Sequence, residues 1–185
     1  MTFNPGENIT LPVLVCKGFV TFPDSNSAIY VERIFSKAAL TISQGNFESY
    51  ILVLTQKDNN QDANFSAENV YDVGTLCRIN AVNGTESIRI RLFGLERIKL
   101  NSLRFDEKAN SYFAEFQVMP DLLGDEKKER VLVETLLNSI EKNREILLDS
   151  QQSITLSKPV SSGLSALKLS YYISNLLDCS TESKI

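Results

Sequence analysis

Hydrophobic residues in the first 120 positions occur in short runs that are separated by Gly, Pro, Asn and Asp residues. Short apolar or alternating runs between such residues are typical of β-strands. The pattern predicts strands at 11–16, 51–54, 73–82, 87–93, 95–103 and 112–118. The run at 51–54 is continuously apolar, which indicates a strand covered on both faces. Short strands with a turn about every ten residues favour a small barrel or sandwich.

Two glycines mark connections between these runs. Asn83-Gly84 precedes the alternating run at 87–93, and this dipeptide is a strong signal for a β-hairpin. Gly94 interrupts the pattern before 95–103, and we expect a bulge or a bend there.

One stretch of this region has the periodicity of a helix. Between positions 31 and 43, apolar residues recur at the spacing of one helix face. The residues of this face are Ile34, Phe35, Ala38, Ala39 and Ile42. The polar, Asn-rich stretch at 58–69 predicts an exposed loop.

The pattern changes to helical spacing near residue 121. An amphipathic helix is predicted to begin at Asp125-Glu126, where acidic side chains interact favourably with the helix dipole. Its apolar face consists of Leu132, Val133, Leu136, Leu137 and Ile140. A second helix is predicted at 164–177, after a Ser-rich linker at 149–163.

The last residues predict the start of a further helix, with Ser180 or Thr181 as its N-cap. Proteins seldom end where a helix begins, so we expect the chain to be a fragment of a longer one. The change of pattern divides the chain into a β-rich part, 1–120, and a helical part, 121–185.

Composition narrows the possible functions. Among 185 residues, 19 Lys and Arg stand against 23 Asp and Glu, and the resulting net charge of −4 argues against a dedicated nucleic-acid module. The chain has no His, which excludes Ser-His and Cys-His catalysis and His-metal sites. Its first residues lack the basic and apolar segments that are typical of a signal peptide, and no apolar run approaches the roughly 20 residues of a membrane span. We expect a cytoplasmic protein without a membrane partner.

The remaining reactive residues do not form a recognisable catalytic or metal site. Cys16, Cys77 and Cys179 are far apart and are interpreted as small buried residues in a reducing compartment. Ser165 and Lys168 fit the pattern S-x-x-K, but the companion motifs of Ser-Lys hydrolases are missing. No glycine-rich phosphate loop and no carboxylate cluster for a metal is present. We therefore assign no catalytic, cofactor-binding or metal-binding residue.

Two surface features remain as candidates. Basic residues alternate along one ribbon and could contact phosphates, although strands that face water commonly carry such charges. They are Arg89, Arg91, Arg97 and Lys99. The second feature is apolar: Leu11-Pro12 and the segment 19–23 are expected near the surface, as a binding site for unfolded chains or a partner. The alternative is that Phe22 points inward and plugs a barrel end.

Several segments follow one another in the order and spacing of a known family. The segment 11–23 is similar to the family's opening pattern L-P-x-L-P-L-[RK]-x-x-V-x-F-P-G, with Asp24 in place of the final Gly. Val31 and Arg33 match its V-G-R stretch. Further similar segments are 52–58, 71–79, 93–98 and 112–115. Together they resemble the N-terminal domain of the Lon family of ATP-dependent proteases.

This resemblance implies an α+β fold: a β-rich twisted pseudo-barrel with one inserted short helix, followed by an all-α subdomain. It implies a non-catalytic domain that binds unfolded or damaged proteins for degradation. The parent chain would be a Ser-Lys endopeptidase that assembles into a homo-oligomeric ring, with ATP and Mg bound only in an ATPase domain outside this chain. A stand-alone adaptor and a module that contacts nucleic acid through residues 89–99 remain as alternatives.

The resemblance also suggests which residues contact substrates. We expect a hydrophobic patch made of Leu11, Pro12, Phe22 and Pro23, extended by Ile29 and Tyr30.

Overall fold

The computed structural model describes residues 3–57, 66–84, 87–120, 124–142, 165–176 and 180–185. They belong to two compact units, one formed by residues 1–120 with 180–185 and the other by residues 121–179. The last six residues, which the sequence pattern assigned to the helical part, are thus grouped with the β-rich unit. Each unit is described by itself.

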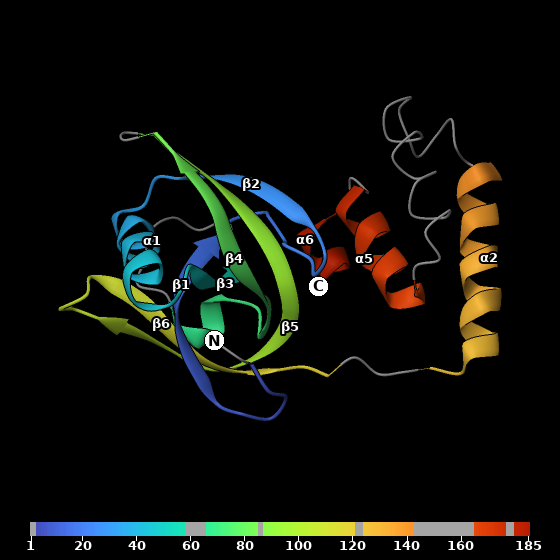
Figure 1. Cartoon of the computed structure of the whole chain (residues 1–185), viewed down its shortest axis with the longest axis horizontal. Helices are drawn as coiled ribbons and strands as arrows, with labels where there is room; N and C mark the ends of the chain where they lie inside the picture. The colour runs from blue at the N-terminus through green and yellow to red at the C-terminus, as the bar shows by residue number, and fades with distance from the viewer. Residues whose placement is uncertain (1–2, 58–65, 85–86, 121–123, 143–164, 177–179) are drawn as a thin grey trace. The chain divides into compact units, whose positions relative to one another are not determined.

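The first unit is a closed sheet with one long helix (Figure 1). Its elements in chain order are β1 (Ile9–Cys16), β2 (Asn26–Val31), α1 (Ile34–Asn46), β3 (Tyr50–Thr55), the 3-10 turn η1 (Ala67–Asn69), β4 (Val73–Asn83), β5 (Ile88–Asp106), β6 (Ser111–Val118) and α6 (Thr181–Lys184). The strand order is β2-β5-β4-β3-β1-β6, and β6 also pairs with β5. That last pairing closes β5, β4, β3, β1 and β6 into a ring, to which β2 is added along β5. The predicted pseudo-barrel with an inserted helix is confirmed.

The length of β5 makes this closure possible. Its first part pairs with β2 and β4, and its second part, from Ile98 to Asp106, pairs with β6. The two strands predicted on either side of Gly94 are one strand. The predicted irregularity is a register shift: Leu76 lies opposite Glu96 and Cys77 opposite Gly94, so Leu95 is an extra residue. The pairing of β4 with β5 across Asn83 confirms the hairpin.

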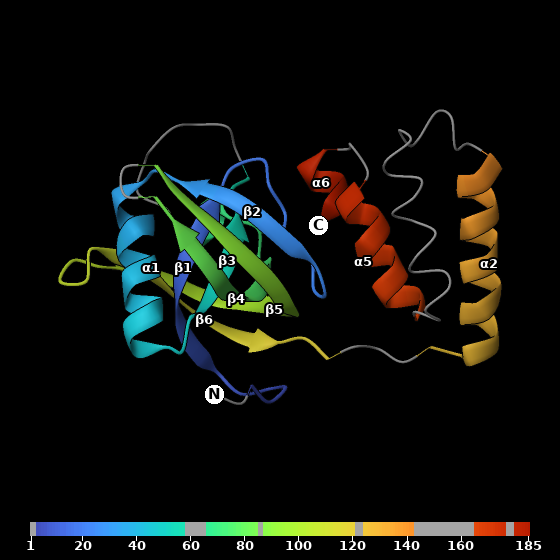
Figure 2. The same ribbon diagram turned by 45° about the horizontal axis from the view of Figure 1, so that its top comes forward.

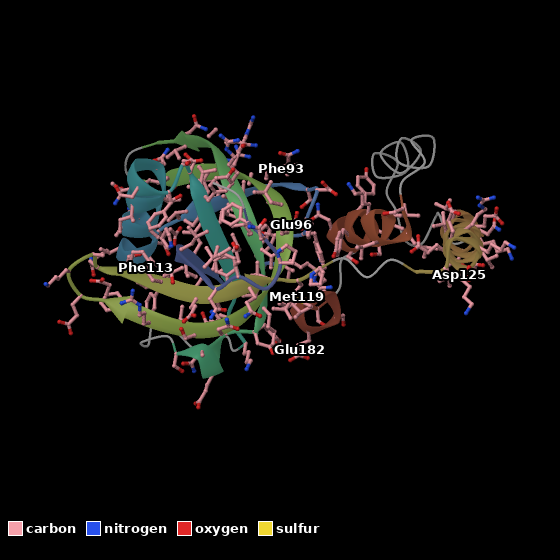
Figure 3. All side chains as sticks on the ribbon, turned by 60° about the horizontal axis from the view of Figure 1, so that its bottom comes forward. Phe93, Glu96, Phe113, Met119, Asp125 and Glu182 are labelled. Atoms are coloured by element: carbon pink, nitrogen blue, oxygen red, sulfur yellow. The ribbon has the colours of Figure 1, made fainter. Side chains whose placement is uncertain are left out.

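Two clusters of apolar side chains stabilise the barrel. The alternate residues of β1 and β3 divide between them, because successive side chains of a strand point to opposite faces. Leu52 and Leu54 of β3 belong to the first cluster, and Ile51 and Val53 to the second, so this strand is covered on both faces as predicted. Phe47, at the C-terminal end of α1, has its ring centroid 6.5 Å from that of Phe113 on β6; Phe113 is labelled in Figure 3.

Residues 17–25, called the strap here, connect β1 to β2 and cross three other strands. The Thr55 hydroxyl of β3 donates to the carbonyl of Phe19 (2.8 Å), and the Thr75 hydroxyl of β4 donates to that of Thr21 (2.6 Å). On β5, Gly94 donates its N–H to the Ser25 carbonyl (2.9 Å). These bonds supply partners for strap carbonyls that burial removes from water. The strap is therefore a fixed part of the barrel wall.

Replacing Thr75 with Val tests how firmly the strap is held. The two side chains have similar shapes, but Val has no hydroxyl, so the Thr21 carbonyl loses its donor inside the protein. We expect Thr75→Val to lower the free energy of unfolding by about 1–3 kcal/mol. Thr75→Ser keeps the donor and is the matched control. Urea unfolding of the three proteins checks this, and equal losses for Val and Ser would show that the hydrogen bond contributes nothing.

Helix α1 is confirmed, but its buried face differs from the predicted one. The buried residues are Ser36, Ala39, Leu40 and Ser43. Ile34, assigned to the apolar face, is 73% exposed. Small side chains allow close approach to the sheet, and the Ser43 hydroxyl donates to the carbonyl of Tyr50 (2.7 Å), which offsets the cost of its burial. A hydrophobicity pattern cannot identify a buried face that contains serines.

Two other segments differ from or extend the predicted pattern. No strand was predicted between residues 16 and 51, but β2 occupies Asn26–Val31. Within the predicted loop at 58–69, residues 66–69 are exposed and include η1, while 58–65 lie outside the described residues.

The second unit contains α2 (Glu126–Lys142) and α5 (Ala166–Leu176), and both predicted helices are confirmed. Val133 and Leu137 of α2 pack with Leu169 and Ile173 of α5. The other apolar residues of α2 that the structure describes, Val131, Leu132 and Leu136, are exposed. The predicted linker at 149–163, the Ile140 side chain and Cys179 lie outside the described residues.

The short helix α6 of the first unit has the predicted N-cap. The Ser183 N–H donates to the Ser180 hydroxyl (3.3 Å), as an N-cap serine requires. Among the helices of the described ranges, none is long and apolar enough to cross a membrane.

Candidate functional site

The structure places four of the predicted patch residues in the interior. Leu11 is fully buried, and Pro12 and Pro23 are also buried. Phe22 is 6% exposed, which agrees with the alternative that it points inward. The expected surface location of these four residues is wrong, because β6 pairs with β1 at Leu11 and Pro12 and the strap packs on the sheet. A role of these residues in binding stays a prediction.

The other two predicted residues lie on the surface of β2. Tyr30 is 63% exposed and Ile29 is half-buried. Both line a groove of about 470 Å³. The groove is lined by Leu14, Val15, Cys16, Lys17, Phe19, Ala28, Ile29, Tyr30, Val31, Glu32, Arg33 and Ser36. Ile34, which follows Arg33 at the start of α1, is exposed but is not among the residues that line the groove.

The groove separates two strands that are not neighbours in the sheet. One wall is the end of β1 with the first residues of the strap, and the other is β2. In the strand order, β5, β4 and β3 lie between them. Figure 2 shows β2 along β5, at the margin of the sheet. The curvature of the barrel therefore brings the β1 end and β2 to opposite sides of one groove.

Arg33 holds the wall on the β1 side. Its guanidinium donates to the Val15 carbonyl (3.3 Å) and to the side-chain oxygen of Gln56 (3.4 Å). It also lies 5.8 Å from the centre of the Phe35 ring. The next carbonyl of β1, that of Cys16, accepts from the N–H of Gln56, the residue that follows β3. Carbonyls alternate along a strand, so the Val15 carbonyl faces the groove and Arg33 satisfies it.

The thiol beside the groove is not a nucleophile at neutral pH. Loss of solvent around Cys16 raises its pKa to about 12, against the smaller opposite effect of the Arg33 charge. Burial also raises the pKa of Cys77. Because the thiolate is the reactive form of cysteine, both side chains remain inert thiols. Cys77 is buried as expected, whereas Cys16 is half-buried.

Most residues of the basic ribbon interact with other residues of the domain. Arg97 donates to the carbonyl of Ile185 (3.3 Å), and Lys99 forms an ion pair with Asp72. The hydrogen bond from Lys99 lowers the pKa of the Asp72 carboxyl. Arg89 lies 5.8 Å from the centre of the Tyr30 ring. Three of the four basic side chains thus have partners within the domain.

The other chemical candidates have structural roles. The Ser165 hydroxyl accepts from the backbone N–H of Lys168 (3.4 Å), as a residue that caps a helix does. Across the described part of the chain, no group of three or more acidic or Cys side chains is placed to hold a metal ion. The groove is therefore the candidate site, and its walls offer apolar contacts and backbone groups.

Solved structures with the same architecture define the fold class. The N-terminal domain of a Lon protease from the Mycobacterium avium complex has a TM-score of 0.65, over 90% of this chain and 80% of its own, at 13% identity. A Lon N-terminal domain protein from Xanthomonas campestris has a TM-score of 0.53, over 80% of this chain and 89% of its own, at 20% identity. At these identities the likeness concerns the fold alone.

Sequence comparison identifies the family. Residues 10–185 match the model of the ATP-dependent protease La (LON) substrate-binding domain, and the chain belongs to this family. A Lon protease of Mycoplasma mobile is 26% identical over 94% of this chain, and one of Azorhizobium caulinodans is 30% identical over 74%. The chain spans 20% and 16% of these two relatives.

Proposed function

We propose that this chain binds unfolded segments of protein substrates, through the groove beside β2, for degradation by a Lon-like ATP-dependent protease. The observation that carries the proposal is the exposure of Tyr30 in a groove whose lining is mostly apolar. Unfolded proteins expose apolar side chains that folded proteins bury, and burying such side chains against this surface is favourable in free energy.

In this proposal the domain is not a catalyst. The Ser-Lys protease site and the ATPase site, with ATP and Mg, belong to the longer protein. The relatives that match are whole proteases, which favours this function over that of a stand-alone adaptor. Assembly of several chains into a ring would present several grooves to one substrate, and avidity would raise a weak affinity for each.

Replacing Tyr30 with Ser tests the location of the site. The change removes an exposed aromatic ring and leaves the barrel core intact. We expect Tyr30→Ser to weaken binding of an unfolded protein about tenfold, a typical loss for an aromatic side chain in an interface. The measurement is titration of fluorescently labelled, reduced and carboxymethylated α-lactalbumin with the 185-residue chain.

Phe105 provides the matched control. It is an exposed aromatic residue, 44% accessible, that lies on β5 and does not line the groove. Phe105→Ser should leave the affinity unchanged. If both variants weakened binding equally, apolar contacts would not be confined to the groove. If Tyr30→Ser left the affinity unchanged, the binding site would lie elsewhere.

A further inference from the structure

The strand β2 has a free edge that faces the groove. In the part of the chain that the structure describes, β2 pairs with β5 along one edge, and no other strand pairs with its second edge. Ala28 to Val31 line the groove as four consecutive residues, as do Leu14 to Lys17 on the opposite wall. A groove over one strand face would be lined by alternate residues. Consecutive residues show that the groove runs along the edges of both strands.

The register identifies which backbone groups of β2 are free. Gly94 of β5 donates to the Ser25 carbonyl and accepts from the Asp24 N–H (3.0 Å), so its backbone faces the strand that continues as β2. Backbone groups of antiparallel strands alternate in direction. Ile29, opposite Ile90, therefore bonds to β5, whereas Ala28 and Tyr30 direct their N–H and C=O groups to the groove.

This edge lacks the features that normally prevent pairing. Proteins protect exposed edges with charged residues or proline in the edge strand. The sequence of β2, Asn-Ser-Ala-Ile-Tyr-Val, contains neither. The opposite wall cannot serve as an equivalent edge, because the Val15 carbonyl already accepts a hydrogen bond from Arg33. The free hydrogen-bonding capacity of the groove is concentrated on β2.

We propose that the edge of β2 binds an extended segment of the unfolded substrate as an additional β-strand. The segment bonds through its backbone to Ala28 and Tyr30, while its alternate side chains contact the apolar walls. Backbone pairing explains how one groove accepts many sequences, since every residue except proline carries the same N–H and C=O groups. The inference rests on the proposed function and specifies how the substrate is held.

A single extended chain fits this groove better than a second copy of the domain. β2 has six residues, which extend over about 20 Å. A β2 strand from another copy would carry its own β5 with it, and the groove of about 470 Å³ between β2 and the β1 end leaves no space for a sheet. An unfolded segment brings no attached strand. The bound partner is thus an extended polypeptide.

Replacing Ala28 with Pro tests the backbone bond. Proline removes the N–H that faces the groove, and edge strands accept it where that N–H is not part of the ladder. We expect Ala28→Pro to weaken binding of carboxymethylated α-lactalbumin about fivefold to tenfold, the effect of one lost hydrogen bond. Ala28→Thr is the matched comparison: it keeps the N–H and suits a strand, so we expect it to lose clearly less affinity than Ala28→Pro.

Amide hydrogen exchange in the wild-type chain gives a second measurement, which does not depend on how the variant folds. Saturation with α-lactalbumin should slow exchange at Ala28 and Tyr30 and leave Ile29, already bonded to β5, unchanged. Binding without slower exchange at Ala28 and Tyr30 would overturn the strand pairing. The strand pairing would also be overturned if the wild-type chain formed a dimer in sedimentation experiments, if Ala28→Pro abolished this dimer, and if the dimer did not bind α-lactalbumin.

The two proposals fail in different ways. If the wild-type chain does not bind the unfolded protein, the proposed function itself is wrong. If Tyr30→Ser weakens binding but Ala28→Pro and the exchange rates do not respond, the groove binds substrates through side chains and only the strand pairing is wrong.

Discussion

Replacing Gly94 with Ala is expected to destabilise the barrel by about 3 kcal/mol or more, a loss that follows when backbone has to move to make room. A Cβ atom at this position would lie 2.0 Å from the carbonyl oxygen of Phe22 and 2.8 Å from its carbonyl carbon. Neither atom can rotate away, because hydrogen bonds from both sides join the strap to Gly94. Either these bonds break or β5 shifts.

Gly45 offers the same substitution with the opposite expected sign. It lies in α1, and a Cβ atom there would have no neighbour within 4 Å. Gly45→Ala should therefore stabilise the protein by up to about 1 kcal/mol, the difference in helix propensity. Urea unfolding followed by circular dichroism measures both variants. A Gly94→Ala protein as stable as the wild type would show that the strap does not pack on β5.

Truncation of Phe116 is the second change with a large expected effect. Its side chain is fully buried in the first cluster, and its backbone lies where the ring closes, opposite Ile9 of β1 and Leu100 of β5. Phe116→Ala should cost about 3–5 kcal/mol, through lost apolar contacts and the cavity left behind. Domains of this kind have total stabilities of about 5–15 kcal/mol, so the variant should unfold far below the wild-type melting temperature.

Phe105→Ala is the control for this truncation, since its ring is partly exposed and leaves no cavity. We expect a loss below about 1 kcal/mol, typical of surface sites. Differential scanning calorimetry compares the two variants. Similar losses for Phe116 and Phe105 would contradict the assignment of Phe116 to the core.

The sequence predicted the barrel strands because most of them bury one or both faces. The alternation from Ile88 to Leu92 and the continuous apolar run at 51–54 follow the burial of these residues directly. The edge strand β2 has no such hydrophobic pattern, since only Ser27 and Val31 are buried. The face of α1 was missed for a related reason: two of its four buried residues are serines, one of them bonded to the Tyr50 carbonyl.

The candidate site was predicted only in part. The family pattern pointed to Ile29 and Tyr30, which line the groove, and to Leu11 and Phe22, which the barrel buries. An apolar motif has the same appearance in a sequence whether it forms a surface or a core. The groove itself depends on how far the sheet curves between β1 and β2, and no local pattern of residues encodes that distance.

The pairing of β1 with β6 has a consequence for how the protein is made. The two strands lie about 100 residues apart along the chain, and ribosomes add about 5–20 residues per second. The part of β1 that pairs with β6, from Ile9 to Pro12, therefore waits roughly 5–20 s for its partner. During that time an apolar strand with unpaired backbone groups is open to other nascent chains. A domain that we propose binds unfolded proteins would thus itself need protection while it is synthesised.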